Sequence, residues 1–186
     1  MKTILITIGL ILGGQLLHAQ DSIPPMPRLG CCVKTKSLTL TDLKKTHPFD
    51  KTNKIQVVSF KPDLTNESPP TKDGTIDTTQ FIETKTLNRK EENGLIDILY
   101  NYNFDPKVNK DSIVLEVMMC YEPRNAVIFR NKSNEIITWL EICFECLRAY
   151  SQRNDLHIVF CQDKYDRLKN YFGQLGIKFG VTEKEE

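Results

Sequence analysis

Six cysteines in a chain of 186 residues are the feature that most restricts how this sequence can fold. An even count favours disulfides in an oxidising compartment, whereas a reducing compartment leaves thiols or metal ligands. The compartment therefore decides what the cysteines do to the fold, and the N-terminus is the place to look for it. The six are Cys31, Cys32, Cys120, Cys143, Cys146 and Cys161.

The N-terminus has the three parts of a secretory signal. One cation, Lys2, precedes an apolar run over residues 4–17, and a small residue, Ala19, follows. The run is shorter than the roughly 20 residues that a helix needs to cross a bilayer, which favours a cleavable signal over an uncleaved anchor. We predict a signal peptide over residues 1–19, no transmembrane segment after its removal, and a periplasmic or secreted protein of a Gram-negative bacterium.

Charge gives little indication of a partner. Removing Lys2 from the 25 lysines and arginines leaves 24, which equals the 24 acidic residues. A neutral chain lacks the basic surface that binds nucleic acid, so we predict no nucleic-acid partner. Residues 28–61 contain eight basic residues and only two acidic ones. Such a run suits an anionic envelope surface or, more often, a solvated face. The partner stays unknown.

The chain divides by composition. Residues 20–30 hold three prolines and are predicted to be a flexible lead-in. Residues 31–85 are weakly patterned, with short strands predicted over 55–60 and 80–84 and a loop over 62–79. Residues 86–180 form the predicted cysteine-containing domain, and residues 181–186 a charged tail.

The pattern of residues 86–180 predicts an α+β fold. Asn88 and Glu91 have the spacing of a helix capping box. Asp163 can cap a C-terminal helix that Gly176 ends. Between these helices, strands are predicted over residues 112–120, 125–130, 136–142 and 156–160. We expect a small antiparallel meander sheet with one helix before it and one C-terminal helix.

Hairpin geometry predicts a cysteine cluster. If the first hairpin turns near Ser133, Cys120 lies opposite residues 145–147. If the second turns at residues 153–154, Cys161 faces Cys146. Directly opposed residues are close enough for a disulfide. We therefore predict that Cys120, Cys146 and Cys161 lie together, with Cys143 nearby.

Three kinds of chemistry fit this cluster. The first is structural disulfide bonding. The second is thiol–disulfide exchange at Cys143 and Cys146, although Glu145 between them would raise a thiol pKa and no helix N-terminus is predicted there. The third is a four-cysteine zinc site, although only one C-x-x-C pair is present. Covalent haem is excluded because Leu147 stands where attachment needs histidine.

Two motifs carry a family resemblance over about residues 87–178. The C-Y-x-P-R run at residues 120–124 and the C-F-x-C run at residues 143–146 resemble those of a family of uncharacterised exported proteins in Bacteroidetes-type bacteria. The resemblance implies export but no activity. That family often has histidine after the arginine, where this chain has Asn125, which argues against a histidine-dependent site.

The remaining candidates are Arg124 and Glu141. Arg124 beside a bulge could bind an anion, or it could pair with Glu122, Glu141 or Glu145 and hold the hairpin ends together. The sequence contains no G-x-S-x-G, no H-E-x-x-H and no phosphate-binding glycine loop. We therefore expect a non-enzymatic binding or envelope role without a cofactor or metal.

Overall fold

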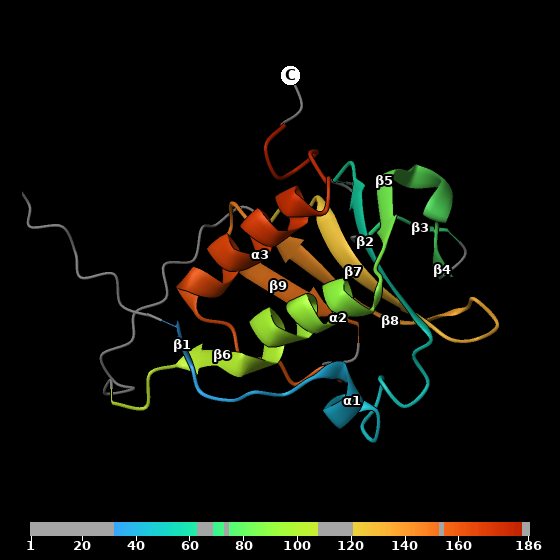
Figure 1. Ribbon diagram of the computed structural model, residues 1–186. Helices are drawn as coiled ribbons and strands as arrows, with labels where there is room; N and C mark the ends of the chain where they lie inside the picture. Colours follow the sequence, from blue (N-terminus) through green and yellow to red (C-terminus); the bar gives the residue numbers. More distant parts are fainter. Residues whose placement is uncertain (1–31, 63–68, 73–74, 108–120, 153–154, 184–186) are drawn as a thin grey trace, which may run out of the picture.

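The computed structural model describes residues 32–62, 69–72, 75–107, 121–152 and 155–183. The predicted signal peptide, the lead-in, the strand over residues 112–120 and two cysteines, Cys31 and Cys120, lie outside these ranges. The described residues form an α+β fold, as predicted, in which helices cover one face of an antiparallel sheet (Figure 1).

Five strands form the main sheet in the order β5-β2-β7-β8-β9, and every neighbouring pair is antiparallel. The last three are consecutive antiparallel strands, of which β7 and β8 were predicted and β9 was not. The first two come from the weakly patterned N-terminal third, which thus shares this sheet. The strands are β2 (Lys54–Phe60), β5 (Phe81–Thr86), β7 (Asn125–Arg130), β8 (Ile136–Cys143) and β9 (Arg148–Ser151).

Two small strand pairs flank the main sheet. The first joins residues near the start of the described chain to residues that follow the second helix, and the second is a short hairpin inside the predicted loop over 62–79. Their strands are β1 (Cys32–Lys34) with β6 (Tyr102–Phe104), and β3 (Thr71–Lys72) with β4 (Thr75–Ile76).

The register of the first hairpin was predicted correctly and that of the second was not. Asn125 pairs with Ile142, as expected for a turn near Ser133. In the second hairpin Cys143 pairs with Arg148, so the turn lies at residues 144–147 and not at 153–154. Leu147 closes it with a positive φ of 51°. The predicted strand over residues 156–160 is not formed, and His157 interrupts that segment with a φ of 47°.

The helix predicted after residue 88 begins at its capping box. α2 (Arg89–Ile96) begins after Asn88, whose side chain accepts the N–H of Glu91, while the Glu91 carboxylate accepts the N–H of Asn88. A π-helical turn, η2 (Asp97–Asn101), continues it. α1 (Leu40–Leu43) is a single turn, and η1 (Thr78–Gln80) is a 3-10 turn before β5.

The C-terminal helix α3 (Gln162–Gln174) begins two residues earlier than predicted. Its N-cap is Cys161, and the expected cap, Asp163, lies inside the first turn. The Asp163 carboxylate instead accepts the N–H of Cys32 at 3.2 Å. Gly176 follows the helix with a φ of 89°, the left-handed conformation predicted for it.

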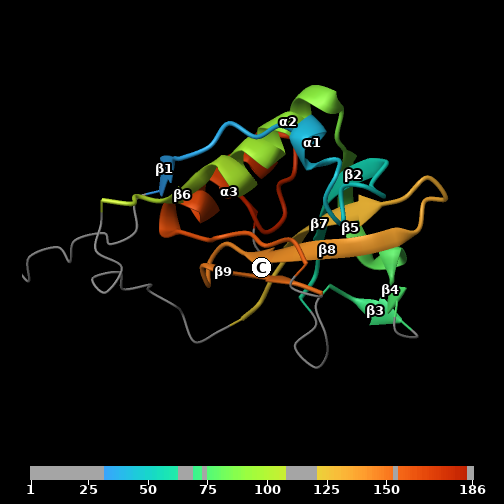
Figure 2. The same cartoon turned by 90° about the horizontal axis from the view of Figure 1, so that it is seen from below.

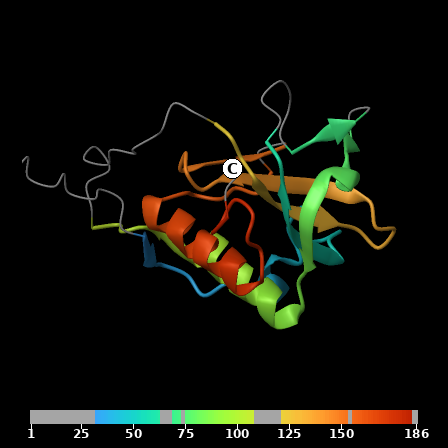
Figure 3. The same ribbon diagram turned by 90° about the horizontal axis from the view of Figure 1, so that it is seen from above.

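The helices bury one face of the sheet. Figures 2 and 3 show α1, α2 and α3 on the same face, with α2 and α3 side by side. Tyr171 of α3 joins these two helices, because its hydroxyl donates to the carbonyl of Glu91 and its ring lies against Gly94. The core between helices and sheet includes Val57, Phe129, Leu140, Leu168 and Phe172. A smaller cluster on the opposite face contains Val58, Phe60, Ile76, Ala126 and Ile128. Within the described ranges, no helix combines the length and apolarity that a membrane span requires.

Candidate functional site

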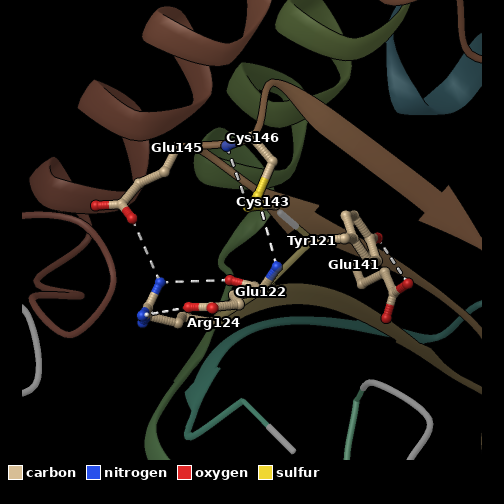
Figure 4. The surroundings of a disulfide bond; sticks show 7 residues. All are labelled: Tyr121, Glu122, Arg124, Glu141, Cys143, Glu145 and Cys146. Carbon is tan, nitrogen blue, oxygen red and sulfur yellow. Dashed lines mark hydrogen bonds and ion pairs between the residues drawn. A yellow bond between two sulfur atoms is a disulfide. The ribbon is translucent and has the colours of Figure 1, made fainter. Parts of the chain in front are cut away.

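A disulfide between Cys143 and Cys146 closes the β8–β9 turn, with its Cα atoms 5.3 Å apart. Both residues are 1% exposed. Each sulfur also accepts a backbone N–H: Cys143 Sγ from Cys146 at 3.2 Å, and Cys146 Sγ from Glu122 at 3.5 Å (Figure 4). The C-F-x-C motif is therefore a buried turn closed on itself.

Arg124 lies beside this turn and joins two acidic side chains. Its Nη2 is 3.1 Å from the Glu122 carboxylate and its Nη1 is 3.6 Å from that of Glu145. The arginine side chain is 15% exposed, while both carboxylates are more exposed. Figure 4 shows Arg124, which directly precedes β7, and Glu145 of the turn pointing toward one another. This arrangement ties the start of β7 to the turn.

Glu141 does not share in these ion pairs. It is 3% exposed, and one oxygen accepts the hydroxyl of Tyr121 at 2.7 Å. Burial, and then the neighbouring Glu141 carboxylate, raise the pKa of Tyr121 far above its ordinary value. Tyr121 is therefore a protonated donor at any physiological pH. The two candidates Arg124 and Glu141 thus belong to two separate contacts.

The second disulfide corrects the predicted cluster. Cys161 bonds to Cys32, 129 positions away, and not to Cys146. The expectation that Cys161 faces Cys146 was wrong because the second hairpin turns within the C-F-x-C motif itself, so β9 occupies the place assigned to residues 156–160. Cys161 is fully buried and Cys32 is 6% exposed.

Lys164 is a feature of this region that sequence reasoning missed. Its side chain is fully buried in the first turn of α3. The ammonium group donates to the carbonyls of Leu99, at 2.7 Å, and Val159. It also lies 5.6 Å from the centre of the Phe160 ring. Burial lowers the pKa of Lys164 to about 8. Its spacing of four from the core residue Leu168 was the one available signal.

A shallow groove runs along the outer side of the helical layer. One hollow of about 350 Å³ lies between the segment after β1 and α2, and a second of about 280 Å³ lies between η2 and α3. Both hollows are lined by Asp97, whose carboxylate forms an ion pair with the Lys34 ammonium group at 2.7 Å. The Tyr102 ring has cations over it, with Arg167 at 4.1 Å and Lys34 at 5.9 Å. Asn93, Asn170 and Gln174 add amides to the walls.

The zinc hypothesis receives no support from the described cysteines. Cys143, Cys146 and Cys161 are all engaged in disulfides, so none is a free thiolate ligand. Across the described ranges, no group of three or more histidine, cysteine, aspartate or glutamate side chains is arranged to hold a metal ion.

Comparison with known proteins adds no relative. No family model, curated protein or solved structure matches the chain. The resemblance carried by the two cysteine motifs therefore stays a prediction. The two disulfides and the groove are the features of the molecule that bear on its function.

Proposed function

We propose that this protein is exported and serves in the periplasm or outside the cell as a disulfide-stabilised, non-enzymatic binding domain. The observation that carries the proposal is the Cys32–Cys161 disulfide, which joins the first described strand to the start of α3. Disulfides of this kind persist in oxidising compartments and are rare in the cytosol. The signal sequence predicted over residues 1–19 fits the same compartment.

The groove along α2 and α3 is the binding surface that we assign. It brings together Asp97, Arg167 and the amides of Asn93, Asn170 and Gln174 beside the Tyr102 ring. Amide, carboxylate and guanidinium groups offer hydrogen-bond donors and acceptors to a ligand that carries polar groups.

Export is tested on the native protein. Cells that carry the gene are fractionated, and the protein is recovered without reductant after blocking free thiols. We expect periplasmic or secreted material that starts at Gln20 and yields peptides linked through Cys32–Cys161 and Cys143–Cys146. Cytoplasmic protein with free thiols at these four positions would contradict the proposal.

Binding is tested by photo-crosslinking in intact cells. A photoreactive phenylalanine analogue is placed at Asn170, an exposed residue of the groove, and the matched control carries it at Lys132 in the exposed β7–β8 turn. We expect a discrete adduct from position 170 that position 132 does not give. Equal adducts from both positions, or none from position 170, would remove the groove as the binding surface.

Thiol–disulfide exchange at Cys143 and Cys146 is the second candidate. The backbone N–H bonds to both sulfurs favour it, because they stabilise a thiolate. The 1% exposure of both cysteines and the nearby Glu145 carboxylate work against it. Reduction of insulin by the protein, abolished in Cys143→Ser, would support this candidate, and failure of the wild-type protein to reduce insulin would remove it.

A further inference from the structure

We propose that the Cys32–Cys161 disulfide, rather than Cys143–Cys146, is the bond that exchanges with dithiols, with Cys32 as the sulfur attacked and Cys161 as the leaving thiolate. This goes beyond the binding role proposed above, since it assigns a redox-responsive site to the other pair of cysteines. The inference rests on the surroundings of the two sulfurs.

Cys161 occupies the better position for a leaving thiolate. It is the N-cap of α3, a helix of 13 residues, so the unpaired N–H groups of the first turn lie at its end of the helix. The positive end of a helix lowers the pKa of a thiol placed there, and a thiol with a lower pKa leaves faster. Cys143 and Cys146 lie in a β-turn and have no such helix.

Lys164 adds an ammonium group to the same turn of α3, and this group is positively charged below its pKa of about 8. It is held by the carbonyls of Leu99 and Val159, so it stays near the start of the helix when the disulfide opens. In the Cys143–Cys146 turn the residue between the two cysteines is the acidic Glu145, whose carboxylate pairs with Arg124 at 3.6 Å. A nearby cation favours a thiolate, whereas a carboxylate disfavours it.

Cys32 is the more accessible of the two cysteines in this disulfide. It is 6% exposed, against full burial of Cys161, and it lies at the first position of β1, a strand of three residues. Its backbone N–H donates to Asp163. Opening so short a strand exposes Cys32, whereas Cys143 ends a strand of eight residues inside the sheet.

The exchange balances with an external dithiol as reductant. One thiolate of the dithiol attacks Cys32 Sγ, the Cys32–Cys161 bond breaks, and its electron pair leaves on Cys161. The second thiolate of the dithiol then displaces Cys32 from the mixed disulfide. The dithiol becomes a disulfide, and Cys32 and Cys161 become thiols after taking up protons. β1 is thereby released from α3.

The test measures each bond separately in the intact mature protein. The protein is equilibrated in dithiothreitol buffers of graded ratio, the thiols are trapped by alkylation, and each cysteine is quantified by mass spectrometry. We expect Cys32–Cys161 to open at a reduced-to-oxidised ratio about tenfold lower than Cys143–Cys146, with the near-ultraviolet circular dichroism still native. Earlier opening of Cys143–Cys146, or joint opening with loss of that signal, would overturn the proposal.

Two variants on α3 separate electrostatics from loosening of the fold. Lys164→Met removes the cation and should lower the equilibrium constant for opening Cys32–Cys161 several-fold. Asp163→Asn removes a carboxylate from the same turn and should raise it. Lys169→Met, farther along the helix, is the control and should leave it unchanged. If the substitutions only loosened the fold, the equilibrium constant for opening would rise in both Lys164→Met and Asp163→Asn. A rise of this constant in Lys164→Met would therefore overturn the proposal.

Discussion

The two disulfides hold two very different parts of the molecule. Cys143–Cys146 spans three positions in a turn that the β7–β8–β9 ladder and the Arg124 ion pairs already hold. Cys32–Cys161 spans 129 positions and fastens a strand of three residues to the start of α3. The first region is fixed by its neighbours in sequence and sheet, whereas the second depends on a bond between distant parts of the chain.

Loop-closure entropy predicts how much each disulfide contributes to the free energy of unfolding. A cross-link stabilises by restricting the unfolded chain, and the effect grows with the length of the closed loop. The relation gives about 5 kcal/mol for a loop as long as the one closed by Cys32–Cys161, and about 2 kcal/mol for the short loop of Cys143–Cys146. The long-range bond should therefore contribute most to the free energy of unfolding.

Removal of the long-range bond should have the largest effect. We expect the double variant Cys32→Ser with Cys161→Ser to lose about 5 kcal/mol of the free energy of unfolding. Urea denaturation followed by circular dichroism measures it. A loss of less than about 2 kcal/mol would mean that the bond does not restrict the unfolded chain as its loop length predicts, and the contrast between the two regions would disappear.

Packing at the hairpin end should come next. Gly180 has a φ of 73°, and a Cβ placed on it would lie 2.5 Å from Asn125 Oδ1 and 2.6 Å from Arg124 Cβ. Gly180→Ala should therefore cost about 3 kcal/mol, combining backbone strain with overpacking.

Gly176→Ala is the matched control for this packing. Gly176 has a similar φ of 89° but nothing within 4 Å of the added Cβ, so the variant should cost only about 1 kcal/mol of backbone strain. Thermal unfolding of the two variants side by side gives the difference. Equal losses would show that the contact of the C-terminal turn with Arg124 and Asn125 does not support the hairpin end.

Removal of the local bond should have a smaller effect than removal of the long-range bond. The double variant Cys143→Ser with Cys146→Ser should lose about 2 kcal/mol and keep a native far-ultraviolet spectrum. The same urea titration measures it. A loss as large as that of the Cys32 and Cys161 double variant would show that the β8–β9 turn depends on its cross-link rather than on the surrounding sheet.

The smallest effect should be a pH dependence confined to the Cys32–Cys161 region. The pKa of Lys164 falls from an ordinary 10.5 to about 8 in the folded protein. Between these values the unfolded chain holds a proton that the native amine has released, so the free energy of unfolding rises with pH. We expect wild type to gain about 1 to 2 kcal/mol over Lys164→Met between pH 7.5 and 9.5. A difference in the free energy of unfolding between the two proteins that stays constant over this pH range would contradict the prediction.

This pH window avoids the opposing effect of the tyrosines. Burial raises the pKa of Tyr171 to about 12 and places that of Tyr165 higher still. Such groups ionise in the unfolded chain first, so they reduce stability as the pH rises above about 10. Measurements at or below pH 9.5 therefore report on Lys164.

The elements that the sequence located are those encoded by neighbouring residues. The capping box of Asn88 and Glu91 lies within one helical turn, and it started α2 as predicted. The apolar runs of β7 and β8 met across a polar turn, and their register followed from the turn position. The turn of the second hairpin was misplaced because Arg153 and Asn154 are the more usual turn residues, and nothing local marks Leu147 for a positive φ.

By itself, the sequence determined the α+β class, α2, the C-terminal helix and the first hairpin, because caps and apolar periodicity act over a few residues. Only the tertiary structure decided that Cys161 joins Cys32, that Lys164 is buried, and that Arg124 pairs with Glu122 and Glu145. These outcomes depend on how α3 and β1 settle against the sheet and the turn. Contacts between residues so far apart are set by packing of whole elements, which no local pattern records.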